Sequence, residues 1–198
     1  MQAKPLLRDI FGFDSFRPGQ EEIVSAVASG SNVLAIMPTG GGKSLCFQLP
    51  ALMRGGITLV VSPLIALMRD QVRSLREVGV EAHALTSGNT AEETESVWQA
   101  LADNTLKLLY IAPERLASQG TLPMLRRAGV SLIAVDEAHC VSQWGHDFRP
   151  DYLRIGELRT ALDVPLAAFT ATADAETQEE IVQKLFGNQR PQVFLRGF

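Results

Sequence analysis

The stretch Asn32-Val33-Leu34-Ala35-Ile36-Met37-Pro38-Thr39-Gly40-Gly41-Gly42-Lys43-Ser44 decides the fold of this 198-residue chain. An apolar run of strand type leads into three consecutive glycines, and a segment compatible with a helix follows from Leu45 to Met53. Glycines in such a turn let successive backbone N–H groups point at one anion, and the helix start adds the positive end of its dipole. The stretch therefore predicts a phosphate-binding loop between a buried strand and a helix.

Two side chains that follow the glycines suit a nucleoside triphosphate and its magnesium ion. Lys43 can reach the outer phosphates as a point charge, and the Ser44 hydroxyl can ligate the metal. The strict pattern G-x-x-x-x-G-K-[ST] is not met, because position 37 is Met. An alternative is a flexible turn with a solvated Lys43. The strand-to-helix context favours the loop, whose predicted phosphate-binding residues are Thr39, Gly40, Gly41, Gly42, Lys43 and Ser44.

A pair of carboxylates follows a second apolar run, Leu132–Val135. Asp136 and Glu137 open the sequence Asp-Glu-Ala-His at the carboxyl end of the expected strand, where open α/β sheets place ligand sites. Asp136 is suited to hold magnesium, directly or through a water, and Glu137 to orient and deprotonate an attacking water. The alternative is an ordinary helix start, since carboxylates favour the first turn. With the upstream loop, the pattern predicts Lys43, Asp136 and Glu137 as catalytic residues, and Ser44 and Asp136 as magnesium ligands.

The composition is that of a single compact domain over residues 1–198. Apolar residues make up 46% of the chain and charged residues 20%, which is ordinary for a soluble globule. No run approaches the roughly 20 apolar residues of a membrane span, and the first ten residues do not form a secretory signal. We therefore expect an intracellular protein, cytoplasmic or nuclear, with no membrane partner.

The cysteines and the net charge limit which kinds of site and partner the chain can have. Cys46 and Cys140 are the two cysteines and neither lies in a C-x-x-C pair, so we expect reduced thiols rather than a zinc site or a disulfide framework. The formal net charge is −4, from 22 acidic and 18 basic residues. Nucleic-acid affinity comes largely from neutralising phosphates, so any nucleic-acid contact must use a local patch.

Strand-like and helix-like segments alternate along the chain. Such alternation predicts an α/β fold with a mostly parallel sheet and helices on both faces. Glycines at 55–56, 79 and 129 lie at the expected helix ends. The expected strands lie near 32–37, 57–62, 82–86, 107–111, 131–136, 165–170 and 192–196, and the expected helices near 19–29, 43–53, 64–77, 90–102, 121–127 and 174–186.

The phosphate loop, the acidic pair and the spacing between them resemble the first RecA-like motor domain of a superfamily 2 helicase, a P-loop NTPase. Further motifs make the chain similar to RecQ-family DNA helicases over nearly its whole length. The most specific is the segment 140–150, which matches the aromatic-rich loop of that family. The other matching segments are 16–20 (adenine recognition), 62–71 and 111–116 (strand contact), and 169–173 (coupling).

The resemblance implies an adenine site ahead of the first strand. Gln20 has the donor and acceptor needed to read the adenine edge, and the Arg17 plane and the Phe13 ring can sandwich the base. Two alternatives remain open at this stage. Phe13 and Phe16 can instead belong to the core, and Gln20 can be a solvated helix residue.

The resemblance also implies contacts to DNA and coupling of those contacts to hydrolysis. Aromatic rings can stack on unpaired bases, and Arg149 can contact phosphate. Trp144 and Phe148 can alternatively fold inward as a small core, His146 can be a core or helix-end histidine, and the threonines can simply suit a strand. The predicted contact and coupling residues are Ser62, Pro63, Gln143, Trp144, His146, Phe148, Arg149, Thr170 and Thr172.

The implied function is ATP-dependent, magnesium-dependent 3′-to-5′ movement on single-stranded or partly duplex DNA, in repair or recombination. The family closes ATP between two RecA-like lobes, so we expect this chain to be the first lobe, with the second lobe in cis and the accessory domains absent. No metal besides magnesium is expected. Alternatives are an RNA-directed helicase of the same superfamily, which the aromatic loop disfavours, a non-catalytic ATP-binding module, which has no use for Glu137, and a phosphotransferase, for which no acceptor motif appears.

Overall fold

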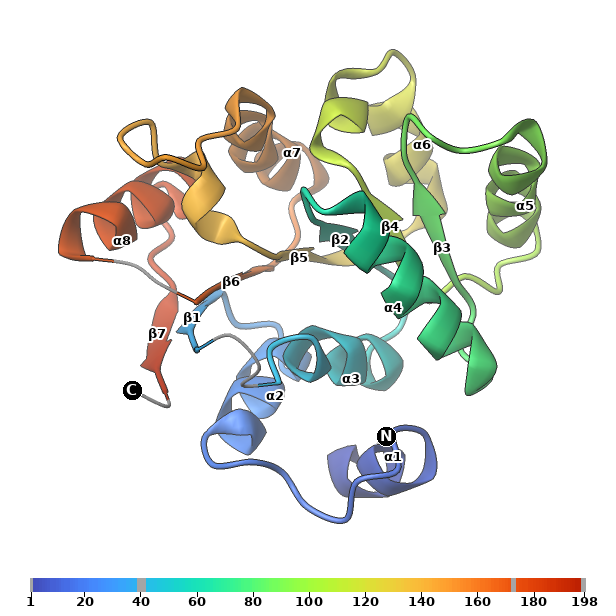
Figure 1. The fold of residues 1–198 in the computed structure, drawn as a ribbon, viewed down its shortest axis with the longest axis horizontal. Coiled ribbons are helices and arrows are strands. Elements are labelled where there is room, and N and C mark those ends of the chain that lie inside the picture. Colours follow the sequence, from blue (N-terminus) through green and yellow to red (C-terminus); the bar gives the residue numbers. More distant parts are fainter. Residues whose placement is uncertain (1, 39–41, 172–173, 197–198) are drawn as a thin grey trace.

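The fold is a wholly parallel sheet between two layers of helices (Figure 1). The computed structural model describes residues 2–38, 42–171 and 174–196. These residues form a seven-stranded sheet in the order β3-β4-β2-β5-β6-β1-β7. This arrangement confirms the predicted α/β class. The strands are β1 (Val33–Ile36), β2 (Ile57–Val61), β3 (Ala82–Leu85), β4 (Leu108–Ile111), β5 (Val130–Val135), β6 (Leu166–Thr170) and β7 (Gln192–Leu195).

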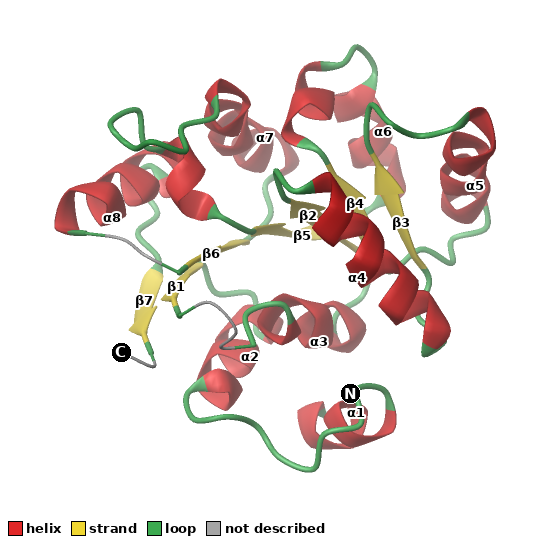
Figure 2. Cartoon of the chain, in the orientation of Figure 1, coloured by secondary structure: helices red, strands yellow, loops and turns green. Residues whose placement is uncertain are grey.

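Helices cover both faces of the sheet, as Figure 2 shows. Buried residues of α1 to α4 pack on one face and those of α5 to α8 on the other. None of the helices in the described ranges is long and apolar enough to cross a bilayer. The helices are α1 (Ala3–Asp9), α2 (Gln20–Ala28), α3 (Leu45–Met53), α4 (Ile65–Glu77), α5 (Ala91–Ala102), α6 (Thr121–Ala128), α7 (Arg154–Leu162) and α8 (Ala175–Ile181).

Side-chain alternation along the strands divides the core into two layers. In β1, Val33 and Ala35 join the cluster under α1 to α4, whereas Leu34 and Ile36 join the cluster under α5 to α8. Strands buried on both faces need continuous apolar runs, because successive side chains point to opposite faces. The strand segments expected from the sequence are therefore found with small differences at their ends.

The first and last residues of several helices are stabilised by capping interactions. Thr90 and Glu93 form a capping box at the start of α5, in which each side chain accepts the other residue's backbone N–H. Gly129 ends α6 in the left-handed region, at φ +81°. The last expected helix, 174–186, is α8 followed by a single π turn over Val182–Phe186.

Two helices, α1 and α7, were not expected from the sequence. The seven-residue α1 buries only Leu7, which is too little for a clear apolar period. The interior of α7 holds Gly156, which weakens a helical pattern. A Cβ at position 156 would overlap the backbone oxygen of Lys184, so glycine permits α7 to pack closely on the π turn. Propensity alone cannot reveal such a packing reason.

Candidate nucleotide and DNA site

The site lies along the carboxyl edge of the sheet. Strand β6 pairs with β1 on one side and with β5 on the other. The segments that follow these three strands therefore begin side by side at one edge: the phosphate loop after β1, the acidic pair after β5, and the segment at Thr170 at the end of β6. The predicted phosphate-binding residues Thr39, Gly40 and Gly41 and the predicted coupling residue Thr172 lie outside the described residues.

Lys43 connects the phosphate loop to the acidic pair. Its Nζ lies 3.9 Å from Asp136 Oδ1 and 3.9 Å from Glu137 Oε1. The Lys43 side chain is only 13% exposed, so the alternative of a solvated Lys43 is wrong. The lysine charge is therefore balanced by two carboxylates.

The two carboxylates have different surroundings. Asp136 is buried, and its Oδ1 accepts the Glu137 N–H at 2.9 Å. Burial raises the pKa of Asp136, an effect that the nearby Lys43 charge opposes. The backbone oxygen of Asp136 accepts a hydrogen bond from the buried Tyr152 hydroxyl at 2.9 Å, which fixes the end of β5. Asp136 is therefore held from both its side chain and its backbone.

Glu137 adopts a backbone conformation that is uncommon for its residue type. Its φ is +53° and its ψ +46°, in the left-handed region. Such strain clusters at functional sites, where surrounding structure imposes it. A short 3-10 turn, Ala138–Val141, does begin here, but the Glu137 side chain makes no cap hydrogen bond and faces Lys43 instead. The acidic pair is therefore more than an ordinary helix start.

Gln20 ties the predicted adenine segment to the phosphate loop. The residue is 3% exposed, so the alternative of a solvated helix residue is wrong. Its Nε2 donates to the Gly42 oxygen at 3.2 Å, and its Oε1 accepts the Arg17 N–H at 2.8 Å. Gly42 has φ +81°, and a Cβ there would overlap the Gln20 amide. The positive φ thus favours glycine at position 42, and a larger residue would displace the Gln20 amide from its contact.

Of Phe13 and Phe16 in this segment, the first is exposed and the second packs against the core. Phe13 is 52% exposed, so it is not part of the core. Phe16 is half-buried and packs against the α1 to α4 cluster, as the alternative for it proposed. Phe13 lines a hollow of about 370 Å³ together with Ser44 and Gln48, which places its ring near the end of the phosphate loop.

His139 is a functional candidate to which the sequence analysis gave no role. Its Nδ1 lies 2.8 Å from the Thr170 Oγ1 and 3.6 Å from Glu137 Oε2, and its Nε2 lies 3.3 Å from Asp147 Oδ2. One imidazole thus joins the acidic pair, the end of β6 and the aromatic loop. Its position in the Asp-Glu-Ala-His sequence was the available signal, but its partners are set by the fold.

The segment between residues 142 and 149 is a surface loop between two 3-10 turns. Trp144 is 85% exposed and Phe148 is half-buried, so an inward-folded Trp144 is ruled out. Neither ring belongs to a buried cluster of the described residues. The remaining predicted contact residues in this loop, Gln143, His146 and Arg149, are exposed.

Of the predicted contact and coupling residues outside this loop, those that the structure describes are buried or half-buried. Thr170 is fully buried beside His139, which agrees with a linking position. Ser62 is also buried, and its Oγ accepts the Leu64 N–H at 3.4 Å, so its hydroxyl supports the loop after β2 instead of facing solvent. Pro63 beside it is half-buried. Contact between Ser62 and a DNA strand would therefore need a change in the conformation of this loop.

Both cysteines are free and buried, as expected from their spacing. Burial raises the pKa of the Cys46 thiol to about 12 and that of the Cys140 thiol to about 12. Cys140 lies in the 3-10 turn that carries His139. Neither thiol is suited to act as a nucleophile at neutral pH.

A parallel sheet with a phosphate loop after β1 and an acidic pair after the nearby β5 defines a P-loop domain of RecA-like fold. The sequence profile of the DEAD/DEAH box helicases matches residues 17–181, and the chain belongs to this family.

Curated relatives include the ATP-dependent DNA helicases RecQ of Haemophilus influenzae and of Synechocystis. The chain is 48% identical to the first over 92% of its own length and 50% identical to the second over 90%. These alignments cover 30% and 39% of the two relatives, so the chain spans about a third of their length. The Pyrococcus furiosus Hef helicase domain has a similar fold, with a TM-score of 0.72 at 23% identity, over 99% of this chain and 39% of that structure.

Proposed function

We propose that this chain is the first, nucleotide-binding motor lobe of an ATP-dependent DNA helicase of RecQ type. In this proposal ATP hydrolysis drives 3′-to-5′ movement on single-stranded DNA, in repair or recombination. The observation that carries it is the contact of Lys43 with both Asp136 and Glu137, because a phosphate-binding lysine beside a metal-binding and a water-activating carboxylate is the arrangement that triphosphate hydrolysis needs. The 48% identity to a RecQ helicase supports the substrate assignment.

Each residue has a separate role in this proposal. Gly42, Lys43 and the neighbouring loop residues bind the phosphates, and Phe13, Arg17 and Gln20 hold the adenine. In the described part of the chain, no group of three or more His, Cys, Asp and Glu side chains is arranged to hold a metal ion. A magnesium ion would therefore depend on Ser44, Asp136 and the triphosphate itself, as hard oxygen ligands allow. When bound, it would neutralise charge on the phosphates.

Glu137 is the proposed base for the attacking water. Its side chain is more exposed than that of Asp136, which leaves room for a water on its open side. The strained backbone at Glu137 supports a position imposed for function. We propose that His139 transmits the state of the aromatic loop to this carboxylate, because it lies between Glu137 and Asp147.

The DNA partner is proposed to contact the exposed aromatic loop. The chain carries a net charge of −4, so affinity for DNA cannot come from a general basic surface. Stacking on Trp144, with Arg149 near a phosphate, provides a local site that does not depend on net charge. A second RecA-like lobe in cis would complete the ATP cleft and supply an arginine to the transition state.

The test uses a polypeptide that carries this lobe and a second RecA-like lobe, below called the two-lobe protein. ATP hydrolysis is measured with magnesium, with and without single-stranded DNA and with single-stranded RNA as the matched control. We expect hydrolysis that DNA stimulates and RNA does not. Equal stimulation by RNA would favour the RNA-directed alternative, and ATP binding without any turnover would favour the non-catalytic module.

A further inference from the structure

The aromatic loop is the segment 142–149, and its first two residues, below called the loop root, are held by a single glutamate of α8. The Ser142 hydroxyl donates to Glu180 Oε1 at 2.8 Å, and the Gln143 N–H donates to Glu180 Oε2 at 3.2 Å. Both oxygens of one carboxylate are therefore used by two consecutive residues. Ser142 is 2% exposed, so this anchor is shielded from water on the serine side. Charge-assisted hydrogen bonds of this kind are stronger than neutral ones.

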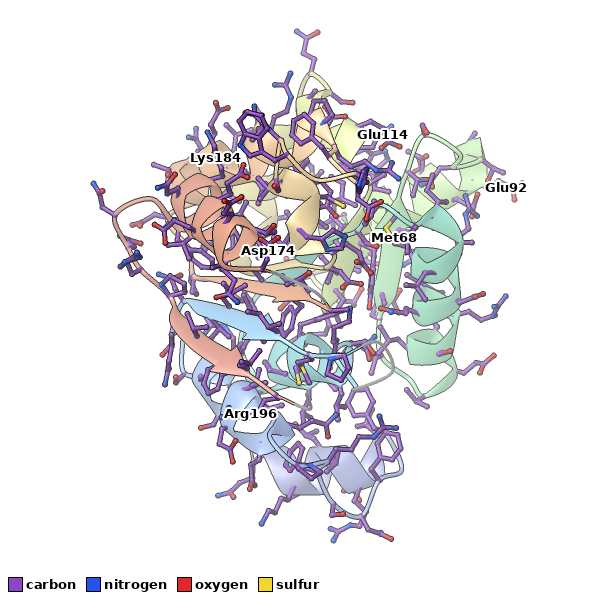
Figure 3. The ribbon with its side chains drawn as sticks, turned by 60° about the vertical axis from the view of Figure 1, so that its left-hand side comes forward. Met68, Glu92, Glu114, Asp174, Lys184 and Arg196 are labelled. Atoms are coloured by element: carbon purple, nitrogen blue, oxygen red, sulfur yellow. The ribbon has the colours of Figure 1, made fainter. Side chains whose placement is uncertain are left out.

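A second contact ties the same segment to β6. His139 binds Thr170 at the end of β6, three residues before Ser142 binds Glu180. The 3-10 turn Ala138–Val141 and the residue that follows it are thus attached to the end of β6 and to α8. Helix α8 is itself fixed on the core, because Asp174 caps its start and Ile181 is fully buried. Figure 1 shows the aromatic loop beside α8, and Figure 3 labels Asp174 in this region.

The wall next to Trp144 is acidic. A hollow of about 450 Å³ is lined by Trp144 and four residues of α8 and the π turn, namely Glu176, Glu179, Glu180 and Gln183. Carboxylates repel the phosphates of a nucleic acid, so a DNA strand is directed to the side of the indole that faces away from α8. The side of Trp144 that meets DNA therefore depends on how the loop root is held.

We propose that Glu180 is a positioning residue for DNA-stimulated hydrolysis. It fixes Ser142 and Gln143 so that Trp144 projects into solvent with one side turned from the acidic wall. This inference rests on the proposed function for its consequence in catalysis, but the anchoring itself is measurable without DNA or ATP. The neighbouring Glu179 offers a matched control, because its carboxylate pairs with Arg190 and not with the loop.

The first experiment measures loop motion in this chain. Trp98 and Trp144 are its two tryptophans, so a Trp98→Phe background makes Trp144 the single reporter. We expect Glu180→Ala to lower the fluorescence anisotropy of Trp144, with unchanged far-ultraviolet circular dichroism. Glu180→Gln should keep the parent anisotropy, because its amide can accept the Gln143 N–H and donate to the Ser142 oxygen. Glu179→Ala should also match the parent.

Ser142→Ala removes one of the two anchoring contacts and serves as a milder second variant. We expect a smaller fall in anisotropy, and little further effect when it is combined with Glu180→Ala, since both changes act on the same contact. Parent anisotropy in the folded Glu180→Ala protein would overturn the proposal. If that variant does not fold, parent anisotropy in Ser142→Ala would overturn it equally.

The second experiment measures DNA-stimulated hydrolysis in the two-lobe protein. We expect Glu180→Ala to raise the DNA concentration for half-maximal stimulation about tenfold, in line with the loss of hydrogen bonds to a charged group, while basal hydrolysis is unchanged. Glu180→Gln and Glu179→Ala keep the anchor and each remove one carboxylate of the acidic wall, so neither should raise that concentration. A parent protein that DNA does not stimulate contradicts the proposed function, whereas a stimulated parent that Glu180→Ala matches contradicts the role of Glu180.

Discussion

Asp136 and Glu137 are adjacent in sequence but are separated by environment. Asp136 is buried and fixed by the Glu137 N–H and by Tyr152, whereas Glu137 stands in a left-handed conformation with a more exposed side chain. One carboxylate is thus rigid and enclosed, and the other is open to a reacting water. This difference supports a metal-holding role for the first and a base role for the second.

Glu137→Gln should bind ATP with magnesium normally but hydrolyse it about 10²–10⁴-fold more slowly, because the amide keeps the shape and loses the base. The measurement is single-turnover hydrolysis and nucleotide binding in the two-lobe protein. Asp136→Asn is the comparison, since it should change the magnesium dependence instead. Collapsed binding with a normal rate per bound ATP would show that Glu137 is not the base.

Lys43→Ala should abolish turnover and also slightly destabilise the lobe. Lys43 is largely enclosed and balances two carboxylates, so its removal leaves their charges uncompensated. Because the group sits at the edge of the cleft, we expect a loss of about 1 kcal/mol, or about 2–4 °C in Tm. Hydrolysis in the two-lobe protein and thermal unfolding of this chain check the two effects. Retained hydrolysis would refute the phosphate-loop assignment.

At the scale of elements, apolar runs and turn residues were sufficient to predict the strands and most helices. The strand β1 is four consecutive buried residues, a pattern that the sequence displays directly. The missed helix α7 depends on a glycine that packs against Lys184, and the role of His139 depends on Thr170 and Asp147, which are distant in sequence. Local periodicity cannot report contacts of this range, nor the left-handed backbone of Glu137.

Trp144→Ala should leave the fold intact but weaken the response to DNA. The ring is 85% exposed, so truncation creates no cavity. Loss of base stacking costs about 1–3 kcal/mol, which corresponds to roughly 5- to 150-fold in DNA affinity. The measurement is DNA-stimulated hydrolysis by the two-lobe protein, with Trp98→Ala as the control on the distant helix α5. A fall in Tm as large as that from truncating a buried core side chain, with unchanged stimulation by DNA, would show that the Trp144 ring has a structural role.

The cap of α8 gives the lobe a defined pH dependence. Asp174 accepts the Thr177 N–H at 2.8 Å, and this hydrogen bond lowers the pKa of Asp174 below its ordinary 3.8. A lowered native pKa means that the stabilisation is fully present above the unfolded pKa and is lost as the pH falls through the native value.

Asp174→Ala should therefore reduce the free energy of unfolding at pH 7, and the difference from the parent should shrink as the pH falls below about 4. Urea unfolding of both proteins at several pH values measures it. Asp174→Asn is the control, because the amide retains an acceptor without a titrating charge. A difference that is constant down to the lowest pH at which both proteins fold would show that the charged cap does not contribute.

At the scale of the whole molecule, the functional residues lie along one edge of one sheet. The phosphate loop and the acidic pair follow strand ends on this edge, Thr170 ends β6 there, and His139 links Thr170 to the acidic pair and the aromatic loop. We expect this edge to form one wall of a nucleotide cleft. The chain spans about a third of the length of the curated relatives that it matches.

This chain alone should therefore bind ATP weakly, hydrolyse it very slowly and fail to unwind a duplex. With one wall of the cleft, the reacting groups are not enclosed, and an arginine from a second lobe, worth about 10³–10⁵ in rate where such residues act, is missing. The measurements are ATP affinity by calorimetry, hydrolysis with and without single-stranded DNA, and strand separation. The Lys43→Ala chain sets the background for hydrolysis and for strand separation. Duplex unwinding by residues 1–198 above that background would show that a single lobe is sufficient and would refute the two-lobe proposal.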